Sequence, residues 1–188
     1  NGNTNKGYSD GFVSKYSSSG TLLWTATQGG IGYDASAAVG VDAQNNVYVL
    51  SGIDGYYGPS HEPIGGAGAN SILVSKYSPE GILLNSVSIT KDVAPRSISV
   101  SPIGDVLVTG SNGMWPRDYI AFLSHDYITS NGTLSSGFWE DTSIGGGSPA
   151  SNAAGSIFLN NYFYITGCQN ADAFIAKYDL NGNQIWQS

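Results

Sequence analysis

The sequence predicts an all-β fold built from a repeated antiparallel unit, and three observations support this prediction. A segment of alternating polar and apolar residues occurs four times, near positions 10, 72, 118 and 172. A second motif, which ends in Gly52, Gly110 and Gly167, recurs at spacings of 58 and 57 residues. The apolar runs are short and many alternate with period two, and we find no stretch with sustained helical periodicity. A fixed spacing of this size indicates a repeat architecture.

Each repeat is expected to contain four strands, named a to d in chain order. We expect one domain with repeats at about residues 8–53, 68–111 and 118–167, followed by a half repeat at 172–188. The predicted strands are residues 12–16, 21–27, 37–41, 47–51, 72–77, 82–89, 97–100, 105–109, 120–124, 137–140, 155–159, 162–166, 174–178 and 184–187.

The connectors between these strands are of two kinds. Strands a and b, and strands c and d, are joined by tight turns in which Gly, Asn, Asp and Pro supply the required backbone angles. The b–c and d–a connectors are longer. Because alternate connectors of an antiparallel meander leave from opposite ends, all the long loops are expected at one end. Such a loop-rich end of a rigid scaffold is the usual place for a binding site.

The first repeat carries a family resemblance. It reads Asp-x-Phe-Val-Ser-Lys-Tyr at residues 10–16, Leu-Leu-Trp at 22–24, Gly-Gly-x-Gly-Tyr-Asp at 29–34, Val-x-Val-Asp at 39–42 and Asn-Val-Tyr-Val at 46–49. This string resembles the seven-bladed β-propeller repeat family, which is common in bacterial secreted and surface proteins. The resemblance covers nearly the whole chain, although Asn85 replaces the tryptophan in the second copy and Leu123 is aligned with the lysine in the third. It implies a β-propeller of radially arranged four-stranded antiparallel sheets.

The strand count indicates an incomplete propeller. Four a–b hairpins but three c–d hairpins correspond to about three and a half blades, so we expect the C-terminal hairpin to begin a blade that the chain does not finish. The missing strands would come from another part of the polypeptide or from another copy, since an open apolar edge invites aggregation. The chain starts at Asn1 without a signal peptide, and we expect it to be processed or partial.

Composition argues against several function classes. The net charge is −7 and the seven Lys and Arg residues are scattered, which disfavours nucleic acid and anionic membrane surfaces as partners. No apolar run is long enough to insert in a membrane. Low charge and many Ser, Thr, Asn, Gly and Tyr residues suggest an extracellular protein, either secreted or on the cell surface. Cys168 is the single cysteine and is expected to be a buried, inert thiol.

No residue pattern selects a catalytic or metal centre. The acidic residues near the loop-rich end have no spacing that selects a pair, and no nucleophile motif occurs. His61 and Glu62 provide fewer ligands than zinc needs, so we expect neither a metal nor a cofactor. Asp179, Asn181 and Asn183 resemble the start of a calcium loop but are predicted to form a hairpin turn.

Two further sets of residues are assigned from their strand positions. The recurring lysines Lys15, Lys76 and Lys177 are expected to pack between blades, with each amine at a polar rim. Strands b carry the tryptophans that we expect in core or interblade packing, namely Trp24, Trp139 and Trp186.

Aromatic and polar residues of the long loops form the candidate ligand-binding set, because aromatic rings beside amides and carboxylates suit sugar rings or protein anchors. The set comprises Tyr33, Tyr56, Tyr57, His61, Asn112, Trp115 and Arg117. Asn131 matches a glycosylation acceptor.

Three functions remain open on this basis. The first is a non-enzymatic extracellular propeller that serves as a structural scaffold, or as a recognition or adhesion surface that binds a glycan or a protein. The second is a subunit of an extracellular fibre or oligomer that assembles through its open half blade. The third, ranked last, is a polysaccharide-processing enzyme that uses acidic residues of the loop-rich end.

Overall fold

The computed structural model describes residues 6–55, 71–90, 93–112, 118–123, 128–130, 138–141, 152–169 and 172–188. Fourteen strands have assigned bounds within these ranges, and they form one two-stranded and three four-stranded antiparallel sheets. They are β1 (Gly11–Tyr16), β2 (Leu22–Gln28), β3 (Tyr33–Val41), β4 (Val47–Gly55), β5 (Ser71–Tyr77), β6 (Leu83–Ile89), β7 (Val93–Val100), β8 (Val106–Asn112), β9 (Asp118–Leu123), β10 (Phe138–Asp141), β11 (Asn152–Leu159), β12 (Tyr162–Gln169), β13 (Asp172–Tyr178) and β14 (Gln184–Gln187).

The all-β prediction is confirmed, and every predicted strand is present. Several strands extend further toward the loop-rich end than the alternating pattern indicated. Tyr33, predicted to lie in a loop, is the first residue of β3 and pairs with Gly55. Asn112, also predicted to lie in a loop, is the last residue of β8 and pairs with Val93. Backbone pairing continued past the apolar residues because it requires no particular side chain.

The grouping of strands into sheets differs from the prediction. The sheets are β3-β4-β5-β6, β7-β8-β9-β10 and β11-β12-β13-β14, while β1 pairs with β2 alone among the described strands. Each four-stranded sheet therefore joins strands c and d of one sequence repeat to strands a and b of the next. The prediction that the C-terminal hairpin is half of an unfinished unit is wrong, because β13 pairs with β12 and completes a sheet. The half unit is the N-terminal hairpin β1–β2.

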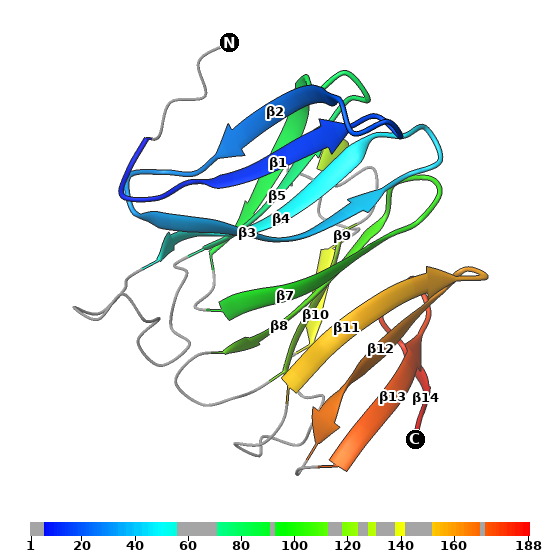
Figure 1. Ribbon diagram of the computed structural model, residues 1–188. Coiled ribbons are helices and arrows are strands. Elements are labelled where there is room, and N and C mark those ends of the chain that lie inside the picture. Colours follow the sequence, from blue (N-terminus) through cyan, green and yellow to red (C-terminus); the bar gives the residue numbers. More distant parts are fainter. Residues whose placement is uncertain are drawn as a thin grey trace.

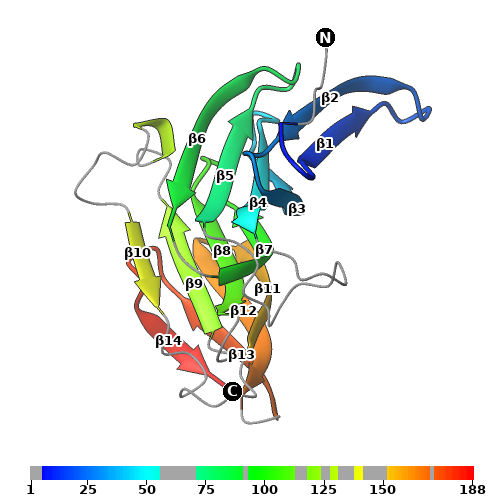
Figure 2. The same cartoon turned by 90° about the vertical axis from the view of Figure 1, so that its left-hand side faces the viewer.

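The sheets follow one another in a row (Figure 1). Strand β7 contacts β3, β4 and β5, and β11 contacts β7, β8 and β9 in the same way. The first strands β3, β7 and β11 lie along one side of the row, and the fourth strands β6, β10 and β14 lie along the other (Figure 2). Strand β1 contacts β3 as β5 contacts β7, so the hairpin β1–β2 holds the place of the third and fourth strands of a sheet.

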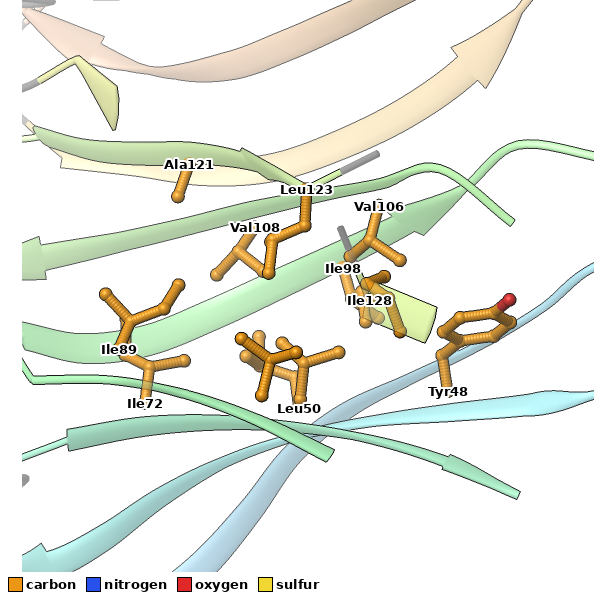
Figure 3. Packing of buried hydrophobic residues seen from close by; sticks show 12 residues of the cluster. Tyr48, Leu50, Ile72, Ile89, Ile98, Val106, Val108, Ala121, Leu123 and Ile128 are labelled. Atoms are coloured by element: carbon orange, nitrogen blue, oxygen red, sulfur yellow. The ribbon is translucent and has the colours of Figure 1, made fainter. Parts of the chain in front are cut away.

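Apolar side chains fill the spaces between successive sheets. The largest cluster lies between sheet β3–β6 and sheet β7–β10, and Tyr48, Leu50, Val108 and Leu123 belong to it (Figure 3). A second cluster around Phe163 joins sheet β7–β10 to sheet β11–β14. A third, smaller cluster joins β1–β2 to sheet β3–β6. Each interface buries one face of each neighbouring sheet, so period-two alternation places apolar residues on both faces of the inner sheets.

Candidate functional site

Of the predicted ligand-binding residues, Tyr33 is the one whose side chain the structure describes. Asn112 is placed by its backbone at the end of β8. The remaining members of the set and the predicted acceptor asparagine lie outside the described residues, namely Tyr56, Tyr57, His61, Trp115, Arg117 and Asn131. The structure therefore brings together a smaller surface at the loop-rich end, around Tyr33.

Tyr33 lies in a stacked aromatic pair that the sequence reasoning missed. Its ring stacks on that of Tyr8, with centroids 4.9 Å apart and planes 11° apart. Backbone hydrogen bonds hold the two segments together, from Tyr8 N to the Gly32 carbonyl at 3.1 Å and from Asp34 N to the Ser9 carbonyl at 3.0 Å. Tyr8 is 74 % exposed, so the pair presents an aromatic surface to solvent. Tyr8 precedes the first strand and has no place in the repeat pattern, so periodicity gave no signal for it.

Two carboxylates, Asp10 and Asp34, follow these tyrosines in the chain and approach each other beside Gly29. A Cβ built on Gly29 would lie 2.5 Å from Asp34 Oδ2 and 2.6 Å from Asp10 Oδ1, so glycine is required where the two side chains meet. Asp34 Oδ2 accepts the Gly30 N–H at 2.7 Å, and Asp10 Oδ2 accepts the Lys6 N–H at 2.9 Å. Asp10 Oδ1 is buried without a hydrogen-bond partner among the described residues.

These acidic side chains do not by themselves make a metal centre. Calcium takes about six to eight oxygen ligands, and two carboxylates supply only a part of that number. Within the described ranges no group of three or more His, Cys, Asp or Glu side chains is placed to hold a metal ion.

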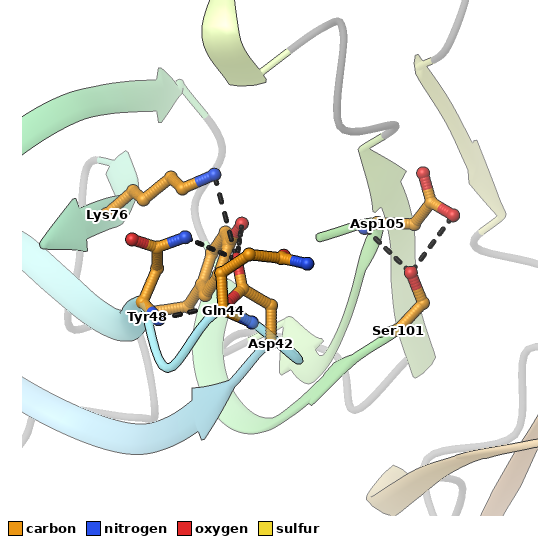
Figure 4. Close-up of polar contacts among 7 residues, drawn as sticks. Asp42, Gln44, Tyr48, Lys76, Ser101 and Asp105 are labelled. Carbon is orange, nitrogen blue, oxygen red and sulfur yellow. Dashed lines mark hydrogen bonds and ion pairs between the residues drawn. The ribbon is translucent and has the colours of Figure 1, made fainter. Parts of the chain in front are cut away.

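The opposite end of the sheets, where the tight turns lie, contains a buried polar cluster (Figure 4). Asp42 Oδ1 accepts the backbone N–H groups of Gln44 and Asn46, both at 2.9 Å. Its Oδ2 accepts hydrogen bonds from the Asn46 amide at 2.8 Å and the Tyr48 hydroxyl at 3.1 Å. Lys76 Nζ lies 3.8 Å from the same oxygen. Asp42 therefore fastens the β3–β4 turn to strand β5.

Electrostatics agree with a structural role for this cluster. Burial pulls the pKa of Asp42 upward, but hydrogen bonds from Asn46, Tyr48 and Gln44 outweigh burial, so its pKa lies below the ordinary value. Burial and the negative charge of Asp42 raise the pKa of Tyr48, which remains a neutral donor. In the next sheet, Asp105 accepts the Ser101 hydroxyl hydrogen bond at 3.1 Å and stabilises the β7–β8 turn.

Lys15 and Lys76 pack between sheets as predicted, whereas Lys177 lies on the outer face of the last sheet with its amine 3.6 Å from the centroid of the Tyr162 ring. The third copy of the motif is also aligned differently. Lys76 pairs with Tyr48 across the β4–β5 ladder, and the equivalent β8–β9 pair is Leu107 with Phe122. The lysine position of that copy is therefore held by Phe122, and the assignment to Leu123 is wrong. The third copy is one residue shorter after its Asp, which shifted the sequence alignment by one position.

The residues that resembled a calcium loop form a hairpin turn, as predicted. Asp179 Oδ1 accepts the N–H groups of Asn181 and Asn183, and its Oδ2 accepts the Asn183 side-chain amide, each at 2.9 Å. The hydrogen bond from the Asn183 amide, together with those from the backbone, lowers the pKa of Asp179. The turn joins β13 to β14.

Two further packing predictions fail in the last sheet. Cys168, expected to be buried, is partly exposed in β12. Trp186, expected in the core or between sheets, is 41 % exposed and meets Tyr164 edge-on at 6.2 Å. Trp24 does pack between sheets, as predicted. The side chain of Trp139 is not among those that the structure describes. Both failures occur because no described element covers the outer face of sheet β11–β14.

An open groove of about 290 Å³ lies between β1 and the first two strands of the next sheet, with Phe12, Val13, Val39 and Val49 among its lining residues. Val39 is 58 % exposed, whereas Ile98, which holds the same register position in β7, is 8 % exposed. The difference arises because the four strands of sheet β3–β6 precede Ile98, whereas β1 and β2 are the described strands that precede Val39.

Comparison with known proteins adds little to this picture. No protein-family model matches the chain, and no curated protein matches it. A solved structure of a protein of unknown function from Bacteroides caccae is similar to it, with 13 % identity and a TM-score of 0.37, over 90 % of this chain and 72 % of that one. The resemblance to the seven-bladed β-propeller repeat family therefore stays a prediction. Within the described residues, no helix is long and apolar enough to cross a membrane.

Proposed function

We propose that this chain is a non-enzymatic, extracellular structural module of the β-propeller type, with a glycan-recognition surface at its loop-rich end. The observation that carries the proposal is the repeated packing of one four-stranded sheet on the next. Strands β7 and β11 each contact the first three strands of the preceding sheet, and β3 contacts β1, which holds the place of a third strand. Successive sheets related in this way are the building plan of a propeller.

The polar residues that the structure describes support a structural role over a catalytic one. Asp42 and Asp105 stabilise tight turns, and Asp34 binds the backbone of the β2–β3 connector. Lys76 neutralises Asp42 in the space between two sheets. These carboxylates are occupied by contacts within the fold, as expected for groups that hold a scaffold together.

The Tyr8–Tyr33 pair supports recognition of a sugar. A ligand ring needs an aromatic face whose orientation is fixed before binding, since a fixed ring loses little conformational entropy. Stacking on Tyr33 and the backbone bridge between Ser9 and Tyr33 supply that fixation.

A binding experiment tests the recognition surface. The purified chain is applied to a glycan array, and the best glycan is titrated against the wild type and against Tyr8→Ala and Tyr33→Ala. We expect either substitution to weaken binding about tenfold or more, since a central aromatic contact contributes roughly 1–2 kcal/mol or more. Ile103→Ala is the matched control, because Ile103 is 64 % exposed in a tight turn at the opposite end. Absence of any glycan binding, or equal affinity in all variants, would contradict the recognition surface.

A further inference from the structure

The interface between the hairpin β1–β2 and sheet β3–β6 contains a set of contacts around Trp24, part of which recurs at the next interface. The indole N–H of Trp24 donates to the Pro79 carbonyl at 3.0 Å, in the turn that joins β5 to β6. Lys15 Nζ donates to the same carbonyl at 2.8 Å. The indole ring also stacks on Tyr77, with centroids 6.2 Å apart. A Cβ on Gly81 would lie 2.6 Å from the indole, so the turn glycine makes room for the ring.

The next interface repeats this contact with a different donor. Asn85 lies opposite Lys76 in the β5–β6 ladder, as Trp24 lies opposite Lys15 in the β1–β2 ladder. The side-chain amide of Asn85 donates to the Ile128 carbonyl, which belongs to the connector between β9 and β10. In both interfaces, therefore, the residue opposite the lysine donates to a carbonyl in the corresponding connector of the following sheet.

The last sheet presents the donor half of this interface without a described acceptor. Trp186 lies opposite Lys177, in the register position of Trp24 and Asn85. Trp186 is 41 % exposed, and the Lys177 amine rests on the Tyr162 ring at 3.6 Å. Ile175 on the same face is 38 % exposed, whereas Val74, at the same register position in β5, is fully buried.

The hairpin β1–β2 presents the acceptor half without a described donor. Its turn, Ser17 to Gly20, closes with the same hydrogen bond as the turn that ends in Gly81, and both glycines have positive φ. A Cβ on Gly20 would meet nothing within 4 Å, where Gly81 has the indole. Tyr16, which corresponds to Tyr77, is 59 % exposed, whereas Tyr77 is 4 % exposed.

We propose that two copies of this chain associate head to tail, with the β12–β13–β14 face of one copy on the β1–β2 hairpin of the next. Trp186 would take the place of Trp24, with its indole N–H directed at the Ser18 carbonyl and its ring over Gly20 and Tyr16. Lys177 would share that carbonyl, as Lys15 does with Pro79. The turn contains three serines and a glycine and therefore offers no cation that would repel Lys177.

Two interfaces within the chain show what covers the face that carries the residue opposite the lysine. The β5–β6 turn accepts the Trp24 hydrogen bond, and the β9–β10 connector accepts that of Asn85. The proposed interface is heterologous, because the two surfaces differ, so association either closes into a ring or continues from copy to copy, according to the rotation between neighbouring copies. In both cases it depends on concentration. The proposal rests on the sheet-to-sheet contacts and is independent of ligand binding at the loop-rich end. Either one can fail without the other.

The test uses the 188-residue chain and two variants that each block one half of the interface. Trp186→Ala removes the donor and the ring. Gly20→Asn fills the space over the turn, and asparagine tolerates the positive φ, as Asn45, Asn160 and Asn161 do in this chain. Ile185→Ala is the matched control, because Ile185 is 50 % exposed and neighbouring strand residues point to opposite faces. Circular dichroism verifies that each variant is folded.

Sedimentation velocity across a concentration series measures the association. We expect the wild type and Ile185→Ala to form dimers or larger species, and each blocked variant to remain monomeric alone. Mixing Trp186→Ala with Gly20→Asn should produce a 1:1 dimer that grows no further, since the mixture retains one intact donor face and one intact turn. A monomeric wild type at all concentrations, or association that both substitutions leave unchanged, would overturn the proposal.

Discussion

The two ends of the row of sheets contain equivalent tryptophans in opposite situations. Trp24 and Trp186 occupy the same register position opposite a lysine, on the fourth strand of their units. Trp24 donates to Pro79 and packs on the following sheet, whereas Trp186 faces solvent and touches its own sheet at Tyr164. The same residue at the same place in the repeat is therefore a structural contact at one end and an exposed surface at the other. What differs is the neighbouring sheet.

The largest expected effect comes from removing each tryptophan in turn. Trp24→Ala should lower the free energy of unfolding by about 2–4 kcal/mol, because it deletes a packed ring and a hydrogen-bond donor between sheets. Trp186→Ala should lower it by less than about 1 kcal/mol, since Trp186 is 41 % exposed and no described sheet packs on it. Urea unfolding at a concentration where the chain is monomeric measures both. Equal losses would contradict the contrast between the two ends.

Alanine at the two turn glycines sharpens the comparison. Gly20 and Gly81 have φ values of +82° and +85°, so alanine strains both turns by about 1–2 kcal/mol. At Gly81 the new Cβ would also lie 2.6 Å from Trp24, whereas at Gly20 it would meet nothing within 4 Å. Gly81→Ala should therefore be more destabilising by a further 1–2 kcal/mol or so, the range for overpacking. Thermal unfolding of the two variants gives the difference directly, and a difference near zero would show that the indole moves aside at no cost.

The smallest effect concerns pH and compares two turn carboxylates. The pKa of Asp42 and that of Asp179 both lie below their ordinary value of 3.8, so folding favours the ionised form of each. Their stabilisation is present at neutral pH and is lost as the pH falls below about 4, through the folded pKa values. Asp42 is buried between sheets beside Lys76, while Asp179 caps an exposed turn. Denaturant unfolding from pH 7 to pH 2 should lose more of its acid dependence in Asp42→Asn than in Asp179→Asn.

The sequence was sufficient to predict the strands. Side chains that alternate between the two faces of a strand give a period-two pattern of apolar residues, and each tight turn requires particular residues. It also predicted that Lys15 and Lys76 are structural. The site was harder to predict, since Tyr8 lies outside the repeated pattern and meets Tyr33 through a contact between segments 25 residues apart. Most of the other predicted site residues lie outside the described part of the chain.

The sequence by itself determined the length and content of the repeating unit, and hence the all-β class. It could not determine which strand begins each sheet, because the strand orders a–b–c–d and c–d–a–b repeat with the same spacing along the chain. Tertiary structure decided this by pairing β4 with β5 and β12 with β13 across the long connectors. That choice left the half unit at the N-terminal end. It also left Trp186 uncovered, because the burial of a side chain depends on which sheet lies beside it.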